Sequence, residues 1–229
     1  GGVSLSIGRK IFTNSQSIIE SNPDNIQTYS NHRLPEAVYY IVSGEKPVQR
    51  ELRAVDYLLE IGDSLTGVAV LYMSIHSFIQ IGDFARSREI IKIFTEIAEQ
   101  YKYAHAQADS HEFCGLISLI RHEPLESKTQ LNAAISIRKK INEETMAVSH
   151  LGMRLQSEVL LGAFNDCKQT LKETDDLVKK VGKLTIPPIW YLPYPIGMAM
   201  YYWAKLERVL IEGDNSKVSA LKKRTLKWG

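Results

Sequence analysis

The chain has 229 residues, of which 44% are hydrophobic, a fraction that supports a continuous core and excludes an intrinsically disordered chain. The formal net charge of +2 gives no whole-protein signal for a nucleic-acid or membrane-surface partner. Cys114 and Cys167 fall on apolar stripes far apart in the sequence, and we expect two buried free thiols in a reducing, cytoplasmic compartment.

The first sixty residues carry helical periodicity with three interruptions. We predict a helix over Val3–Ser21, which ends because Pro23 cannot continue it. A second helix is predicted over Ile26–Ser43. After a turn at residues 44–47, a third helix is expected over Val48–Ile61.

The middle of the chain divides into three similar units of forty residues, 64–102, 103–142 and 143–182. Each unit contains two predicted helices, which are Leu65–Ile81 with Phe84–Tyr101, Tyr103–Arg121 with Pro124–Ile141, and Glu143–Leu161 with Phe164–Val181. The second helices agree position by position. Small residues recur in their first turns, at Ser87, Ser127 and Cys167, and would allow close helix packing.

The last unit, 183–229, departs from this rhythm. A Pro-rich and aromatic segment, 184–203, adds about eleven residues, and its prolines exclude one straight helix. We predict helices over Ile196–Ile211 and Val218–Trp228. The aromatic residues of this segment are expected to pack in the core more often than to form a binding platform.

Two of the turns carry a family resemblance. Gly82-Asp83-Phe84, with Ser87 three residues later, closely resembles the turn of the tetratricopeptide repeat (TPR), and Gly162-Ala163-Phe164 with Cys167 is a fair match. The forty-residue period resembles the TPR-like tails of MalT-like regulators, signalling ATPases and ATPase-linked nucleotide cyclases. This resemblance covers roughly residues 45–226 and implies an all-α, right-handed superhelix of antiparallel helix pairs (an α-solenoid). We expect 1–229 to form one such domain of a larger protein.

The resemblance also implies where a partner binds, because the first helices of TPR units line a concave groove. The groove residues expected on this register are Tyr72, His76, Gln80, Asp109, Glu112, Ser149 and Gln156. Such a wall suits a protein or peptide partner, and we expect a non-catalytic interaction scaffold. The alternative is a small-ligand effector-sensing arm of a signalling ATPase, nucleotide cyclase or transcription regulator.

Motifs for catalysis or phosphate binding are absent from the sequence, so we expect no enzyme activity and no cofactor. On a helix, His105, Asp109 and Glu112 would share one face and could hold a cation, but we expect polar groove or surface residues there and no metal site.

Basic runs at Arg138-Lys139-Lys140, Lys179-Lys180 and Lys222-Lys223-Arg224 lie near predicted helix C-termini, where cations oppose the helix dipole, so nucleic-acid binding is not expected. The uncharged stretch Ser64–Gly82 is nearly long enough to span a membrane. Its polar residues and its lack of basic anchors favour a helix buried within the array.

Overall fold

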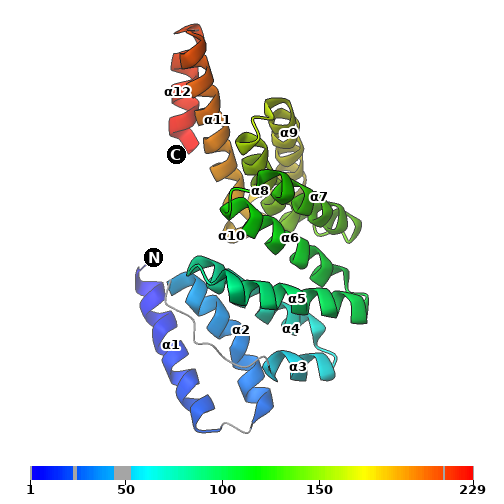
Figure 1. Cartoon of the computed structure of the whole chain (residues 1–229). Coiled ribbons are helices and arrows are strands. Elements are labelled where there is room, and N and C mark those ends of the chain that lie inside the picture. Colours follow the sequence, from blue (N-terminus) through cyan, green and yellow to red (C-terminus); the bar gives the residue numbers. More distant parts are fainter. Residues whose placement is uncertain (1, 23–24, 44–52, 214, 229) are drawn as a thin grey trace. The chain divides into compact units, whose positions relative to one another are not determined.

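The structure is a computed structural model that describes every residue except 1, 23–24, 44–52, 214 and 229 (Figure 1). Throughout these described ranges the regular secondary structure is helical, which confirms the all-α prediction. Contacts divide the chain into two compact units, unit 1 (Gly1–Glu96) and unit 2 (Ile97–Gly229). The division falls within a single helix, α5 (Phe84–Tyr101).

Unit 1 is built around α2 (Ile26–Ser43), which packs on α1 (Gly2–Glu20), α3 (Arg53–Glu60) and α4 (Ser64–Gln80). Pro35 lies within α2 without ending it. The predicted turn at 44–47 and the first part of the predicted third helix lie outside the described residues.

The apolar helix α4 is buried along much of its circumference. Its buried residues Val68, Leu71, Ile75 and Phe78 lie on one stripe, at spacings of three and four residues. Val70 and Ser77, which lie on the opposite side of the helix, are also buried, so α4 packs on more than one side. Within the part of the chain that is described, no helix is both long enough and apolar enough to cross a membrane.

Unit 2 contains the remaining helices, α6 (Ala104–Ile120), α7 (Pro124–Lys140), α8 (Glu144–Leu160), α9 (Phe164–Val181), the short 3-10 helix η1 (Lys183–Thr185), α10 (Pro188–Tyr191), α11 (Pro193–Glu212) and α12 (Asn215–Trp228). From α6 to α9, each helix packs on the next. Helix α11 then packs on α8 and on α12. The bounds of α6 to α9 agree with the predicted helices to within one residue.

The last two helices begin three residues earlier than predicted, at Pro193 and at Asn215. Pro193 and Pro195 fit the first turn of α11 because the first amides of a helix have no intrahelical acceptor. The segment before α11 forms η1 and α10, so the prolines do interrupt a single straight helix, as expected.

Residues with a left-handed backbone follow each other at intervals of twenty between α3 and η1, and they are Gly62, Gly82, Lys102, His122, Asn142, Gly162 and Gly182. At Gly82, the amide of Gly82 donates to Ile79 O at 3.0 Å and that of Asp83 to Phe78 O at 2.9 Å. This pair of bonds is a Schellman C-cap. Oδ1 of Asp83 also accepts from Arg86 N at 3.0 Å, so one short turn ends α4 and starts α5.

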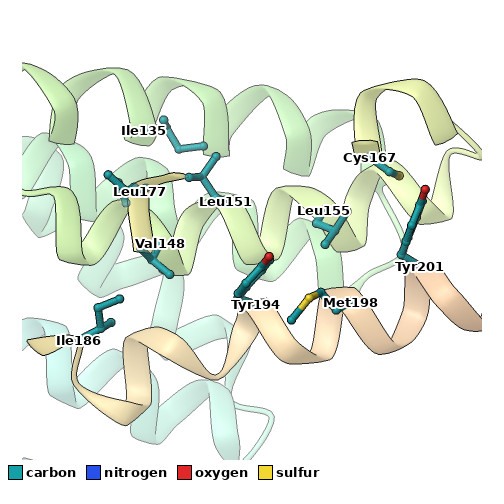
Figure 2. Close-up of a cluster of buried hydrophobic side chains, with 11 residues drawn as sticks. Ile135, Val148, Leu151, Leu155, Cys167, Leu177, Ile186, Tyr194, Met198 and Tyr201 are labelled. Carbon is teal, nitrogen blue, oxygen red and sulfur yellow. The ribbon is translucent and has the colours of Figure 1, made fainter. Parts of the chain in front are cut away.

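The main core of unit 2 lies between α8 and α11 (Figure 2). Leu155 of α8 lies on the side of Met198 of α11, and Leu151 points toward Ile135 of α7; these side chains and that of Tyr194 are all buried. Cys167 of α9 lies in the same core, and both cysteines of the chain are free thiols, although Cys114 is only half-buried. The aromatic and Pro-rich segment therefore contributes to the core rather than forming a separate appendage.

Two glycines allow α8 and α11 to approach at the level of the backbone. A Cβ atom added to Gly152 would lie 2.4 Å from Tyr194 N, and one added to Gly197 would lie 2.9 Å from Gly152 O. Real Cβ atoms do not approach backbone atoms so closely. The crossing of α8 and α11 therefore requires both glycines and fixes the position of α11 on unit 2.

Candidate functional site

The residues expected to line a groove are distributed over both compact units. Tyr72, His76 and Gln80 lie on α4 in unit 1, where the Tyr72 ring is buried with its centre 4.9 Å from that of His76, and Gln80 is exposed. The other four residues lie on α6 and α8 in unit 2.

The two carboxylates of the expected groove are buried among α6, α7 and α8. Asp109 and Glu112 expose 3% and 1% of their surface, and Arg138 of α7, which faces both, exposes 1%. Nη2 of Arg138 pairs with Oδ1 of Asp109 and lies 4.0 Å from Oε2 of Glu112. These side chains thus stabilise the contact between helices and are not presented on an open wall.

Two further side chains complete this charged layer. Nη1 of Arg138 pairs with Oε2 of Glu143, and Nε2 of the fully buried His150 lies 2.8 Å from Oε2 of Glu112. We define the Arg138 cluster as Asp109, Glu112, Arg138, Glu143 and His150. The cluster joins the end of α7 to both α6 and α8.

The Arg138 cluster places three carboxyl groups around one guanidinium group. The pKa of Asp109 is raised to about 8, chiefly by burial and also by the nearby charges of Glu112 and Glu143, against the lowering effect of Arg138. Burial and the same acidic surroundings, Asp109 and Glu143, raise the pKa of the Tyr103 hydroxyl. Asp109 therefore keeps a proton at neutral pH, which reduces the excess of buried negative charge.

The possible cation site of the sequence analysis is divided among other partners. His105 lies with Nδ1 2.9 Å from Oε1 of Glu143, Asp109 pairs with Arg138, and Glu112 lies beside His150. Over the described ranges, no three or more His, Cys, Asp or Glu side chains are grouped so that they could hold a metal ion.

A second charged cluster connects α8 to α9. Nη2 of Arg154 donates to Oγ1 of Thr170 at 3.0 Å and to Oε2 of Glu173 at 2.6 Å. Thr170 in turn donates to Oε2 of the buried Glu158 at 2.7 Å. Burial would raise the pKa of Glu173, but hydrogen bonds from Lys139 and Arg154 lower it overall, so this carboxylate stays ionised.

The last two expected groove residues are also used within unit 2. Ser149 is buried in α8, and Nε2 of Gln156 donates to the backbone oxygen of Pro193 at 3.0 Å. Gln156 therefore holds the start of α11 on α8. Tyr194 adds a second bond nearby, because its hydroxyl donates to Oδ1 of Asp175 at 2.6 Å.

Sequence reasoning missed the role of Arg138 and did not identify His150. Arg138 was expected only to oppose the helix dipole near a helix C-terminus, yet it is among the largest fully buried side chains of the described residues. Its position gives a signal, because it follows Leu131 and Ala134 on the buried stripe of α7 at helical spacing. A charged residue on such a stripe predicts a buried partner of opposite charge.

The side of α11 that faces away from α8 exposes a row of large apolar residues. We define the α11 row as Leu192, Ile196, Trp203 and Leu210, which are exposed by 58%, 43%, 57% and 52%. Their spacings of four, seven and seven residues return to one side of a helix, since seven residues make about two turns. Nε1 of Trp203 donates to Oε1 of Glu207 at 2.7 Å, so this ring is held in place at the surface.

Comparison with known proteins found no matching family model, no matching curated protein and no matching solved structure.

Proposed function

We propose that the chain is a non-catalytic scaffold of TPR-like helical repeats that binds an amphipathic helix of another protein along the α11 row. The twenty-residue spacing of the left-handed turns supports the repeat architecture, because each pair of helices then occupies forty residues. The observation that carries the functional proposal is the α11 row itself.

The α11 row has the dimensions of a helix-binding surface. From Leu192 to Leu210 it extends over about 27 Å, at about 1.5 Å per residue. Exposure of such a long row of apolar side chains to water is unfavourable in free energy. Aligned exposed apolar residues commonly mark interaction sites. A second helix packed along the row would bury all four side chains between its own apolar residues.

The opposite side of α11 is buried and keeps the α11 row exposed to solvent. Gly197, Met198 and Tyr201 are buried against unit 2, and Gly197 allows the backbone contact with α8. The helix therefore cannot rotate to bury the α11 row without losing this crossing. The row stays available to a partner while its helix is held rigidly, which lowers the entropy cost of binding.

The carboxylate of Glu207 indicates what charge a partner helix on the α11 row should carry. Glu207 lies beside Trp203 at the edge of the row, and it is the charged residue of α11 closest to that side. A partner helix with Leu, Ile or Phe on one side and a Lys or Arg next to that side would complement both the apolar row and this carboxylate.

A selection of displayed peptides tests this proposal. A library of random 18-residue peptides would be selected against the full chain, and enriched clones would be measured against Ile196→Glu and Leu184→Glu. Leu184 is fully exposed and lies outside the row, so its variant controls for added charge and lost apolar surface. We expect clones with apolar residues at helical spacing that bind the wild type and Leu184→Glu. Their binding to Ile196→Glu should be at least about tenfold weaker, a loss of about 1.4 kcal/mol.

Two results would contradict the proposal. One is a selection that yields no helical clone, or clones that bind Ile196→Glu as well as the wild type. The other is concentration-dependent self-association of the wild type that Ile196→Glu abolishes, which would assign the row to a second copy of the chain.

A further inference from the structure

We infer that α9, α11 and α12 together form a binding site for a phosphate-type anion, with Lys168, Lys205 and Arg224 as its main ligands. This site is separate from the α11 row and does not depend on the proposed function. Within the part of the chain that the structure describes, its three cationic side chains have no carboxylate as an ion-pair partner.

Two cations of the site lie on neighbouring aromatic rings. Nζ of Lys205 is 5.4 Å from the centre of the Tyr201 ring, and Cζ of Arg224 is 5.6 Å from that of Tyr202. The two ring centres are 5.3 Å apart. These cation–π contacts place Lys205 of α11 and Arg224 of α12 on two neighbouring rings of α11.

The charged groups that act on Lys205 are all cationic. Burial lowers the pKa of Lys205, and Lys168 of α9 with Arg224 and Lys217 of α12 lower it further. Among the described residues, neither Lys168, Lys205 nor Arg224 forms an ion pair with a carboxylate. Positive charge from α9 and α12 therefore acts on Lys205 of α11.

Lys128 shows how the same chain treats a lysine that it neutralises. Its Nζ lies 2.6 Å from Oδ2 of Asp166 and 3.6 Å from Oε1 of Glu158, and the hydrogen bond with Asp166 raises its pKa. The pKa of Lys205 moves in the opposite direction. An anion bound at Lys205 would supply the charge that Asp166 supplies at Lys128.

The charge and the donors of the site favour a phosphate group over a single carboxylate. A carboxylate carries one negative charge on two oxygens, and could neutralise one of the converging cations. A phosphate or pyrophosphate carries more charge on more oxygens, so ammonium and guanidinium groups can each donate to a different oxygen. Lys168 and Arg224 are exposed, so the site is open to such a group, whether free in solution or attached to a partner.

Titration of the full chain with inorganic pyrophosphate and inorganic phosphate would test the site, with sodium chloride at matched ionic strength as the reference. Calorimetry would give the affinity, and the ¹³Cε resonance of Lys205 would report its pKa. We expect saturable binding of pyrophosphate together with a rise in the pKa of Lys205 towards its ordinary value. Lys205→Gln and Lys168→Gln should each weaken binding by about tenfold, the effect of one charge-assisted contact.

The matched control is Lys179→Gln, which removes one positive charge from α9 at an exposed position beside Asp176. It should bind pyrophosphate like the wild type, and circular dichroism melts would confirm that all three variants are folded. The inference is overturned if pyrophosphate acts no differently from chloride, or if Lys179→Gln weakens binding as much as Lys205→Gln does. It is also overturned if a hexaglutamate peptide or a single-stranded oligonucleotide binds and pyrophosphate cannot displace it, because the ligand would then be another class of polyanion.

Discussion

At the scale of single residues, Arg138 is the side chain on which the charged interior of unit 2 depends. Its guanidinium group contacts Asp109, Glu112 and Glu143, and it is almost completely buried. Removal of one partner from a buried ionic cluster leaves the opposite charges desolvated and unpaired. The neighbouring Lys139 also pairs with a carboxylate, Glu173, but it does so at the surface.

These two residues give a direct comparison of buried and exposed ion pairs. We expect Arg138→Met to lower the free energy of unfolding by roughly 3–5 kcal/mol. Lys139→Met should lower it by about 1 kcal/mol or less, because exposed pairs gain little. Urea denaturation of both variants would measure the difference. Equal effects would show that the Arg138 cluster is hydrated and not buried.

Asp109 makes the stability of the protein depend on pH in an unusual direction for an acid. Its pKa is about 8 in the folded chain, compared with 3.8 when unperturbed, so the unfolded chain binds fewer protons between these values. The contribution of Asp109 to the free energy of unfolding is therefore complete at low pH and decreases as pH rises from about 4 to about 8.

Asp109→Asn provides the test, because Asn resembles the protonated carboxyl group and does not titrate. We expect the wild type to lose stability relative to this variant as the pH is raised from 5 to 8. Urea denaturation at several pH values would give the difference between the two proteins at each pH. Parallel curves would mean that Asp109 is ionised throughout, as a simple partner of Arg138.

At the scale of helices, the crossing of α8 and α11 is the most demanding contact of unit 2. Gly152→Ala would push a methyl group against the backbone of Pro193 and Tyr194, which cannot move aside as a side chain can. We expect a loss of about 3 kcal/mol from this overpacking. Gly67→Ala in α4 is the matched change, because its Cβ would meet Leu58 at an ordinary 3.6 Å.

Gly67→Ala should raise stability by roughly 0.5–1 kcal/mol, since alanine favours a helix more than glycine does. Thermal and urea denaturation of the two variants would show the opposite signs. A mild effect of Gly152→Ala would mean that α11 can move away from α8, and would also weaken the argument that the α11 row is rigidly presented.

The turns between helices make a second pair of opposite predictions. Gly82 has a left-handed backbone with free space around it, so Gly82→Val should cost about 1–2 kcal/mol through backbone strain alone.

His122 has the same left-handed backbone conformation although it is not a glycine, and His122→Gly should therefore stabilise the protein by up to about 1 kcal/mol. The control is Glu123→Gly at the neighbouring position, which has a negative φ; this substitution should destabilise the protein. Melting temperatures would decide each case.

The sequence predicted helices better than it predicted their contacts. The bounds of α5 and α9 agree with the prediction to the residue, because a glycine turn with a local cap is encoded within a few neighbouring positions. Burial of Asp109 and Glu112 depends on Arg138, which lies 29 residues after Asp109, and this pairing has no local signature. For the same reason, the sequence did not predict the hydrogen bond from Gln156 to Pro193 or the backbone contact of Gly152, because both join α8 to the distant start of α11.

At the scale of the whole molecule, both compact units combine apolar and charged interiors. Unit 1 includes the apolar α4 and a buried ion pair of Arg33 with Glu36, and unit 2 combines the apolar core of Figure 2 with the Arg138 cluster and the charged contacts of Arg154. The helix α5 belongs in part to each unit, so the chain passes from one to the other without a linker. Both proposed binding surfaces lie on unit 2.

The proton held by Asp109 has a thermal consequence for the entire chain. Near pH 7 the folded protein carries this proton and the unfolded chain does not, so each unfolding event transfers a proton to the buffer. Tris releases much more heat than phosphate when it takes up a proton. Calorimetry at one pH should therefore record a smaller enthalpy of unfolding in Tris than in phosphate. This difference should shrink in Asp109→Asn. The buffer dependence of the unfolding enthalpy thus reports the proton of a single buried carboxyl group.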